Sequence, residues 1–554
     1  MSNEVKEEPK EIKEEKNEIK NKPKEIKEEK KEMKEEKKEI KEEKKEIKEE
    51  KKEIKEEKKE IKEEKKEIKE KTKPQIILSD KPFPYNVRRW IPEIELDKII
   101  QNLKHPHYHT RVVQYNVLCD SLLPISTKIV EDDISKLPYL LWENRSKKIL
   151  SELKNLNADL ISLIEIEKDE NFIKELNSYG YEFAFKPRTG KHSEGCAIAW
   201  KIEKYELIDL LSIAFNINKN ENNISEIYNR DNIALIGIFK LINIPNSIIL
   251  FACTHLIFNT RRGDIKLGQI YQLINSLEEL RKKYEDELKN KVYIIIGSDL
   301  NCIPKSGVYK LLTTGELNCN QIDKTYVSGQ DQENLQYVNP PTKIRAYLFS
   351  KITSIFKEEI QKNSKFKNNY IDYKNNNNGL PSQDNVKWFN EICRIKPVIK
   401  EHNISLDYDK NYKYKDFELI LKIPLIFKSA YATMTKNCLE FLDNKYNELP
   451  FNMMKDTNKI EINGLKIGKE EIEKTKSFIK GLTLENPFSY YSNDTVMSLD
   501  YIFYYSKNDD IKVVRTLNIP DMFKLFFDIG YMPNEIYPSD HLSIAADLIL
   551  GGEK

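Results

Sequence analysis

Residues 1–72 repeat a seven-residue unit in which only one position is apolar. From Ile26 to Ile68 the unit KEIKEEK recurs nearly without error, so an apolar residue returns every seventh position. Glu and Lys four residues apart stabilise a helix by about 0.2–0.5 kcal/mol per pair, whereas a stable coiled coil needs two apolar positions per heptad. The pattern predicts a lone, charge-stabilised helix or a disordered tether. A weak coiled coil, a helix that binds a protein partner and a plain spacer are the alternatives.

From about residue 80 onward, short apolar runs of strand length alternate with segments of helical periodicity. The two clearest helices are predicted at 141–155 and 265–284, where apolar residues recur every three or four positions. Because many strands follow one another directly, we expect a layered domain of helices and sheets over 80–552, with much antiparallel pairing. The strands are predicted at 111–118, 159–166, 195–200, 233–239, 247–253, 292–298, 498–505 and 543–550.

The periodicity weakens between about residues 320 and 423. This segment contains the run Asn375–Asn378 and many Lys and Tyr residues. Connections of this length inside a domain are uncommon and are usually functional or irregular. We therefore expect a poorly constrained insertion at 320–423, with at most a few short helices, as at Lys343–Gln361.

The balance of charge excludes a global basic field of the kind that many nucleic-acid-binding proteins have. The chain has 92 Lys and Arg residues against 91 Asp and Glu residues, so any attraction to phosphate must come from local patches or a metal. The seven cysteines form no CxxC pair, which indicates reduced thiols in an intracellular protein. Without a signal sequence or an apolar run of membrane length, we expect no membrane association. The cytoplasm is the expected location, with the nucleus as the alternative because Lys-rich tracts resemble import signals.

Polar side chains interrupt or end six of the apolar segments. A charged carboxylate in such a run costs several kcal/mol unless it is paired or bound to a metal, so six of these segments together predict one shared polar site. Hard oxygen ligands favour Mg²⁺, with Mn²⁺ as the alternative, and no His/Cys cluster has the spacing of a zinc site. The residues concerned are Asn116, Glu165, His255, Asp299, Asn301, Asp500, Asp540 and His541.

Each of these residues also has a plain structural explanation. Asn116 could cap a strand end, His255 could be a core histidine with satisfied hydrogen bonds, and Asp299 and Asn301 could form a turn. All of these explanations would have to hold at once in six segments. We therefore favour an enzyme.

The segments resemble, in their usual order, the motifs of the exonuclease–endonuclease–phosphatase superfamily, and within it the branch of the Ccr4-type deadenylases, nocturnin and the Angel proteins. The resemblance covers roughly Arg88 to Leu550, apart from the insertion. It implies an α+β fold, a two-layered β-sandwich flanked by helices and preceded here by the charged segment. The matching segments are 115–120, 188–190 with 194–198, 229–232, 254–256 with 261–267, which is most similar to Angel proteins, 306–308 and 428–431.

The resemblance also implies roles for individual residues. Glu165 would be the main metal ligand, with Asn116 beside it and Asp540 completing the metal or water network. Asp299 would activate the attacking water or protonate the leaving oxygen, and His541 would contact the phosphate or act as general base. The supporting roles implied are Asn301 holding the phosphate, Asp500 orienting His541, and His255 and Asn232 lining the phosphate pocket.

Basic and aromatic residues near these motifs could bind RNA. Arg188, Arg261 and Arg262 would contact the backbone, as would Lys191 and Lys266, for which a solvated basic surface competes. Bases could stack on three aromatic residues, with core packing as an equal alternative. These aromatic residues are Phe258, Tyr490 and Tyr491.

Four positions depart from the family pattern without removing a catalytic group. Ile164 stands where relatives usually have Gln, Ser298 where they have Gly, Thr260 where they often have Pro on the wall that holds a base, and Glu194 where they have Asp. Ile164 and Thr260 leave the preference for poly(A) open.

Together the motifs predict a Mg²⁺-dependent phosphodiesterase that acts on single-stranded RNA 3′ ends. A deadenylase-type 3′–5′ exoribonuclease in mRNA decay ranks first. An Angel-like RNA 2′,3′-cyclic phosphatase ranks second and a nocturnin-like dinucleotide phosphatase third. A non-catalytic RNA-binding scaffold is the alternative from another class, against which the intact polar site argues.

Overall fold

The computed structural model of the chain divides into two compact units, Met1–Asp80 and Lys81–Lys554. The charged repeat and Lys343–Gln361 lie outside the described residues, so their predictions stay untested. The structure describes residues 88–91, 96–97, 108–129, 131–217, 225–242, 244–320, 322–330, 382–408, 419–434, 436, 459–462, 465–468, 485, 488–492, 495–520 and 531–551.

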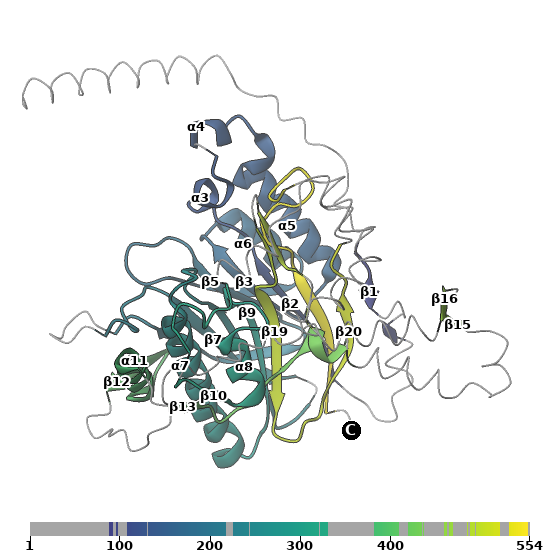
Figure 1. Cartoon of the computed structure of the whole chain (residues 1–554). Coiled ribbons are helices and arrows are strands. Elements are labelled where there is room, and N and C mark those ends of the chain that lie inside the picture. Colours follow the sequence, from purple (N-terminus) through teal and green to yellow (C-terminus); the bar gives the residue numbers. More distant parts are fainter. Residues whose placement is uncertain are drawn as a thin grey trace, which may run out of the picture. The chain divides into compact units, whose positions relative to one another are not determined.

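Two large mixed sheets form the second unit (Figure 1). The first sheet has the strand order β1-β20-β21-β2-β3-β5-β4. All of its neighbouring strands are antiparallel except β2 and β3, which run parallel. Its strands are β1 (Trp90–Ile91), β2 (Tyr108–Asn116), β3 (Leu160–Ile166), β4 (Tyr181–Pro187), β5 (Gly195–Lys201), β20 (Ile511–Leu517) and β21 (Ile544–Leu550).

The second sheet has the strand order β11-β12-β6-β7-β8-β9-β19-β14. Its parallel pairs are β8 with β9 and β12 with β6. Its strands are β6 (Tyr205–Ala214), β7 (Ile233–Leu241), β8 (Ser247–His255), β9 (Lys291–Asp299), β11 (Ile395–Lys400), β12 (Asn403–Tyr408), β14 (Lys428–Ser429) and β19 (Asp500–Ser506).

Three buried clusters give the sandwich its layers. Apolar side chains of both sheets meet between them, as with Ile164 and Cys253. The outer face of the first sheet packs against α5 (Trp142–Leu156) and α6 (Glu170–Ser178). The outer face of the second sheet packs against three helices. These are α7 (Gly263–Arg281), α8 (Gly307–Thr314) and α11 (Gln383–Cys393), with a short π-helical segment, η3 (Lys282–Glu287), after α7.

Shorter elements complete the described part of the chain. They are α3 (Leu123–Thr127), α4 (Glu131–Ile134), η2 (Pro138–Leu140) and the two-stranded sheets β10 (Glu316–Asn318) with β13 (Ile420–Lys422), β15 (Lys459–Ile462) with β16 (Leu465–Gly468), and β17 (Tyr490–Ser492) with β18 (Thr495–Met497).

The predicted two-layered sandwich with flanking helices is confirmed. Every predicted strand and both predicted helices are present, with ends that differ by a few residues. Part of the segment expected as an insertion is instead regular structure of the domain. After residue 381, α11 packs on the second sheet, and β12 pairs with β6 through Asn403 and Ile404. The sequence pattern missed this because polar or charged residues interrupt the short strands β11 and β12, which form one edge of that sheet.

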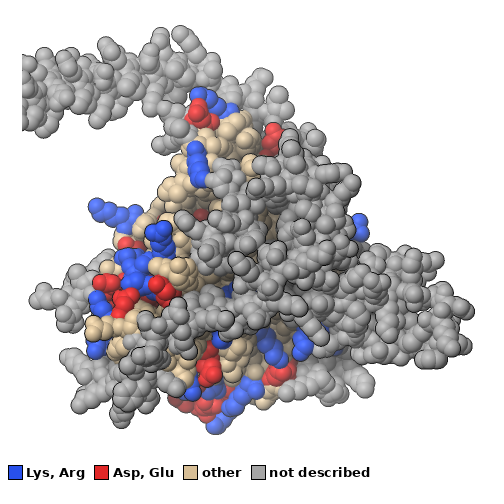
Figure 2. All heavy atoms as spheres, viewed as in Figure 1, with Lys and Arg blue, Asp and Glu red and all other residues tan. Residues whose placement is uncertain are grey.

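The surface agrees with the balanced composition. On the face drawn in Figure 2, acidic and basic side chains of the described residues lie side by side instead of in separate regions. None of the helices in the described part of the chain is both long and apolar enough to cross a lipid bilayer. Six cysteines among the described residues are free thiols.

Candidate active site

Strand directions bring the predicted polar residues to one rim of the sandwich. The parallel strands β8 and β9 end together, with His255 paired to Asp299. Antiparallel β19 begins opposite that point, so Asp500 pairs with Asp299. On the facing sheet, parallel β2 and β3 end at the same rim with Asn116 and Glu165. Backbone hydrogen bonding therefore aligns the strand ends within each sheet, because parallel strands place their carboxyl ends at one edge. A hydrogen bond between Asn116 and Asp299 shows that the two edges meet.

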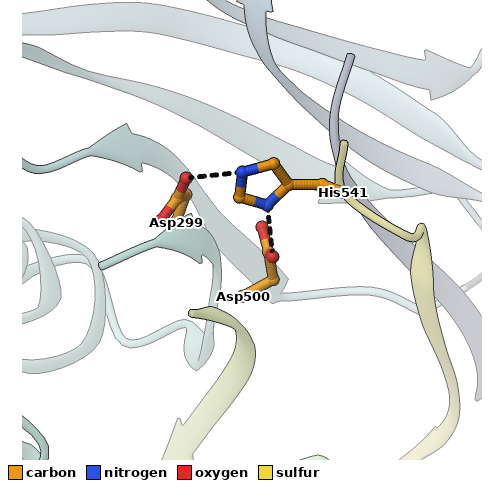
Figure 3. Close-up of side chains that lie close together, drawn as sticks. All are labelled: Asp299, Asp500 and His541. Carbon is orange, nitrogen blue, oxygen red and sulfur yellow. Dashed lines mark hydrogen bonds and ion pairs between the residues drawn. The ribbon is translucent and has the colours of Figure 1, made fainter. Parts of the chain in front are cut away.

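His541 lies between two aspartates at this rim (Figure 3). Its Nδ1 lies 2.7 Å from Asp500 Oδ2, and its Nε2 lies 3.7 Å from Asp299 Oδ2. Burial alone would lower the pKa of His541, but the charge of Asp500, the hydrogen bond to it and the charge of Asp299 raise the pKa well above 6.5. The imidazole is therefore held as a cation with its Nδ1–H fixed by a carboxylate, an arrangement suited to stabilising negative charge.

Asp299 and Asn116 join the two sheets. Asn116 Nδ2 donates to Asp299 Oδ2 at 3.1 Å, and the backbone N–H of Leu118 donates to Asn116 Oδ1. Burial and the nearby charge of Asp500 raise the pKa of Asp299 to about 7. A carboxyl with a pKa near neutrality can accept or release a proton under ordinary conditions.

Glu165 reaches the site through a local break in β3. Its backbone is left-handed, with φ at 53°, and the pairing of β3 with β5 shifts register between Ile164 and Ile166. Such conformations are unfavourable for side chains other than Gly and cluster at functional sites. Burial and the charge of Asp540 raise the pKa of Glu165 to about 8.

His255 is a neutral member of the site. Burial and the charges of Arg188, His541 and Lys266 lower its pKa to about 3. Its Nε2 can therefore accept the hydrogen bond from Asn301 Nδ2, at 2.8 Å. Its Nε2 also lies 3.7 Å from Glu165 Oε1, which at neutral pH is a polar contact and not an ion pair.

Asn232 supports His255 from behind. Its Nδ2 donates to the His255 carbonyl at 3.1 Å, while its Oδ1 accepts from Gln269 Nε2 at 3.2 Å. Both ends of the buried Asn232 amide are thus used within the protein. These contacts hold the histidine, and the predicted phosphate contact of Asn232 stays a prediction.

The donor set fits a divalent cation. The oxygen and nitrogen atoms of Asp299, Asp500 and His541 lie within 4.8 Å of one another. However, His541 Nδ1 and Asp500 are engaged with each other, so these two groups serve better as a hydrogen-bonded pair than as ligands. Burial and neighbouring carboxylates raise the pKa values of Glu165 and Asp299, and a divalent cation bound beside Glu165 would offset the repulsion among these carboxylates.

Asp540, also predicted in the metal network, is held by a serine. Ser126 Oγ of α3 donates to Asp540 Oδ2 at 2.5 Å. Ser492 Oγ donates in turn to the Ser126 carbonyl. The carboxylate is therefore fixed in place next to His541 in the chain.

The three arginines predicted to bind substrate have different surroundings. Arg188 donates to buried Glu194 at 2.6 Å, and its charge reaches His255. Arg262 makes two 2.9 Å bonds to Asp264, which offset its charge. Arg261 is exposed. Arg188 is thus near the catalytic rim and oriented, whereas Arg262 is already engaged.

The other residues predicted to contact the substrate differ in how exposed they are. Lys191 is exposed, but Lys266 is fully buried, so it is neither a solvated surface residue nor placed to touch an RNA backbone. The side chain of Phe258 is 74% exposed, and the Tyr490 ring lies 4.9 Å from that of His541. Tyr491 is buried against Tyr531, as the core-packing alternative expects.

Sequence reasoning missed several residues that support the site. Gln114 Nε2 donates to Asp500 Oδ1 at 3.0 Å, and the two-residue period of β2 could have placed it on the same face as Asn116. Buried Arg145 donates to the carbonyls of Val117 and Pro538 and so joins two site-bearing loops. No sequence signal marked Arg145, because it lies within an ordinary amphipathic helix.

One departure from the family pattern has a visible cost. Ser298 is buried, and its Oγ has no hydrogen-bond partner in the part of the chain that is described. Glu194, by contrast, is well used through its bond to Arg188. Ile164 belongs to the core between the sheets.

Comparisons with known proteins find relatives for part of the chain. Residues 113–345 match the model of the Endonuclease/Exonuclease/phosphatase family. The chain is 32% identical to carbon catabolite repressor protein 4 homolog 3 of Arabidopsis thaliana over 47% of this chain and 55% of that protein. It is 31% identical to human protein angel homolog 2 over 40% of each chain. The chain thus spans about half or less of these curated relatives.

A solved structure shares the fold over nearly its whole length. The crystal structure of ANGEL2, described as a 2′,3′-cyclic phosphatase, matches with a TM-score of 0.52 and 21% identity, covering 84% of this chain and 98% of that one. ANGEL2 in complex with adenosine-2′,3′-vanadate gives the same TM-score. The likeness confirms the architecture.

Proposed function

We propose that this chain, whose residues 113–345 belong to the Endonuclease/Exonuclease/phosphatase family, is a divalent-metal-dependent phosphoesterase that acts on RNA 3′ ends. The proposal depends on one observation: Asn116, Asp299 and His541, from distant parts of the chain, meet at one rim beside Glu165. A non-catalytic scaffold would not need the carboxylates of Glu165, Asp299 and Asp540 close together at the cost of their repulsion.

Different residues of the site would carry out different parts of the reaction. When bound, Mg²⁺ would be held by Glu165, with Asn116 and Asp540 beside it, and would neutralise charge on the scissile phosphate. Asp299, with a pKa of about 7, takes the proton from the attacking water. Protonated His541, fixed by Asp500, donates from Nε2 to a phosphate oxygen. Positioning and neutralisation of charge are the main demands of phosphoryl transfer.

For the substrate we favour an RNA 2′,3′-cyclic phosphate. The sequence motifs alone rank a deadenylase first, but the wall that would hold an adenine carries Thr260 in place of proline. The Thr260 carbonyl is bound by Ser328 Oγ at 2.5 Å. Recognition would then depend on the terminal phosphate more than on the base. Similarity to human protein angel homolog 2 and to the fold of a 2′,3′-cyclic phosphatase supports this choice.

A deadenylase-type exoribonuclease is the second candidate. The match to carbon catabolite repressor protein 4 homolog 3 is the observation that favours it. The charged side chains near the rim, such as Arg188, would hold a single-stranded backbone without regard to sequence.

One experiment separates the two candidates. Purified chain is incubated with Mg²⁺ or with EDTA and with two RNAs of equal length, one ending in a 2′,3′-cyclic phosphate and one ending in a poly(A) tail with a free 3′-hydroxyl. We expect Mg²⁺-dependent loss of the cyclic phosphate and slow shortening of poly(A). Shortening of poly(A) with an untouched cyclic end would select the deadenylase, and full activity of a Glu165→Gln variant would refute both.

A further inference from the structure

Lys266 occupies an unfavourable position that the proposed mechanism does not use. Its side chain is fully buried, and it lies in the first turns of α7, which begins at Gly263. Burial disfavours an ammonium ion, and the N-terminal end of a helix carries partial positive charge. The free-energy cost of burying this lysine must be offset by favourable interactions. The hydrogen bonds of Lys266 show which interactions these are.

The ammonium group bonds to the turn that follows β9. Lys266 Nζ donates to the Asn301 carbonyl at 2.6 Å and to Gln330 Oε1 at 3.1 Å. Both acceptors are neutral, so the charge strengthens the bonds without being cancelled; such charge-assisted bonds are roughly twice as strong as neutral ones.

Asn301 is the residue of the turn that needs holding. Its backbone is left-handed, with φ at 48°. Its N–H donates to Asp299 Oδ1, and its Nδ2 donates to His255 Nε2 and to the Leu256 carbonyl. These bonds tie Asn301 to the catalytic rim, whereas the bond at its carbonyl comes from α7 outside the rim.

We infer that Lys266 is a positioning residue, which pins the turn Asp299–Asn301 to α7 and thereby aims the Asn301 amide at the catalytic rim. The inference deepens the proposed phosphoesterase function and rests on it for its effect on rate. Lys266 touches no reacting atom and acts through the backbone of Asn301. The helix thus fixes the distance between its own first turns and the end of β9.

Two substitutions separate this role from plain packing. Lys266→Met keeps the length of the side chain but removes both charge and donor, whereas Lys266→Gln keeps a donor without the charge. Lys174→Met is the matched control, because Lys174 is an exposed lysine on α6. Crystal structures of the variants and steady-state kinetics on the cyclic-phosphate RNA are compared with wild type.

In Lys266→Met, we expect Asn301 to leave the left-handed conformation and to lose its contact with His255. We also expect kcat to fall by about 10- to 100-fold with KM little changed, as for other residues that support an active site from outside. Lys266→Gln should keep the turn and stay within a few-fold of wild type, and Lys174→Met should match wild type.

An unchanged Asn301 in the Lys266→Met structure would overturn the inference. If that variant does not fold, the crystal structure of Lys266→Gln decides. A hydrogen bond from the introduced amide to the Asn301 carbonyl would support the positioning role of Lys266. An intact turn without that bond would refute it. If the wild-type protein has no activity, the proposed function fails. The inference about Lys266 can still be tested, because the crystal structures show the conformation of the turn whether or not the protein is active.

Discussion

His541 and Asp500 form a hydrogen bond of 2.7 Å although 41 residues separate them in the chain. Asp500 begins β19 in one sheet, and His541 precedes β21 in the other. The other oxygen of Asp500 accepts from Gln114, which also belongs to the sheet of β21. One buried carboxylate thus connects the two sheets and fixes the imidazole.

Removing this carboxylate should change the protonation of His541. In Asp500→Asn the largest charge that raises the pKa of His541 is lost, and burial, which lowers the pKa, is opposed by the remaining charges of Asp299 and Asp540. We expect the imidazole of the metal-free variant to lose its proton at a lower pH than in wild type. Selective ¹⁵N-histidine NMR titration measures this. Asp407→Asn, at an exposed position of β12, is the control, and an unmoved His541 midpoint would contradict the assigned pairing.

Glu165→Gln should remove a metal ligand and should also make the metal-free protein more stable near pH 8. Because the folded pKa of Glu165, about 8, exceeds its ordinary value of 4.5, the folded state holds a proton that the unfolded state has released between these values. The stability of the metal-free wild type should therefore fall as pH rises from 4.5 to 8. The variant should lack this contribution and melt at a higher temperature near pH 8.

Thermal unfolding with EDTA and with Mg²⁺ measures both effects. Mg²⁺ should raise the melting temperature of wild type and leave the variant unchanged, since a ligand that binds only the folded state stabilises it. An equal Mg²⁺ shift in both proteins would show that Glu165 is not a ligand.

Ser298→Ala should stabilise the fold. The buried hydroxyl has no partner in the described part of the chain, so its loss removes a desolvation penalty and should add about 1 kcal/mol to the free energy of unfolding. Ser162→Ala is the matched opposite, because Ser162 Oγ donates to the Gly297 carbonyl at 3.0 Å and its loss should cost about 1 kcal/mol. Urea unfolding compares the two variants; equal effects would mean that Ser298 has a partner.

Arg145→Met should loosen two loops of the site together. The guanidinium is fully buried, and its loss leaves the carbonyls of Val117 and Pro538 without that donor. Each unpaired buried group costs about 1–3 kcal/mol, so we expect a loss of about 3 kcal/mol in urea unfolding. Arg145→Lys keeps the charge but loses the several N–H donors of the guanidinium. Its free energy of unfolding should lie between those of wild type and Arg145→Met. A Met variant as stable as wild type would exclude this bracing role.

The fold was predictable wherever hydrophobic runs were long and regular. The strands that carry Asn116, Glu165, His255 and Asp299 are mostly buried apolar runs, and the motifs at their ends indicated both the family resemblance and a shared polar site. Two strands of the first sheet were not predictable. β4, at one edge, and β20, between β1 and β21, are short apolar runs interrupted by charged residues, and such short patterns also occur in loops.

The sequence predicted that Asn116, Asp299, Asp500 and His541 lie close together, but it did not predict most of the hydrogen bonds among the site residues. The family resemblance already implied that Asp500 orients His541. Sequence spacing, by contrast, cannot show that Asn301 bonds to His255, because this contact depends on side-chain orientation. Lys266 shows the same limit: its motif indicated a phosphate contact, and only the three-dimensional packing shows that helix α7 buries it behind the turn.

The place of β21 in its sheet affects when the protein becomes functional during synthesis. This strand is hydrogen-bonded on one side to β20 and on the other to β2, which lies more than four hundred residues earlier in the chain. Until the ribosome has released residues 544–550, the nascent sheet has a gap in its middle and His541 has no fixed position. A nascent chain without these residues therefore cannot hold His541 beside Asp299 and Asp500.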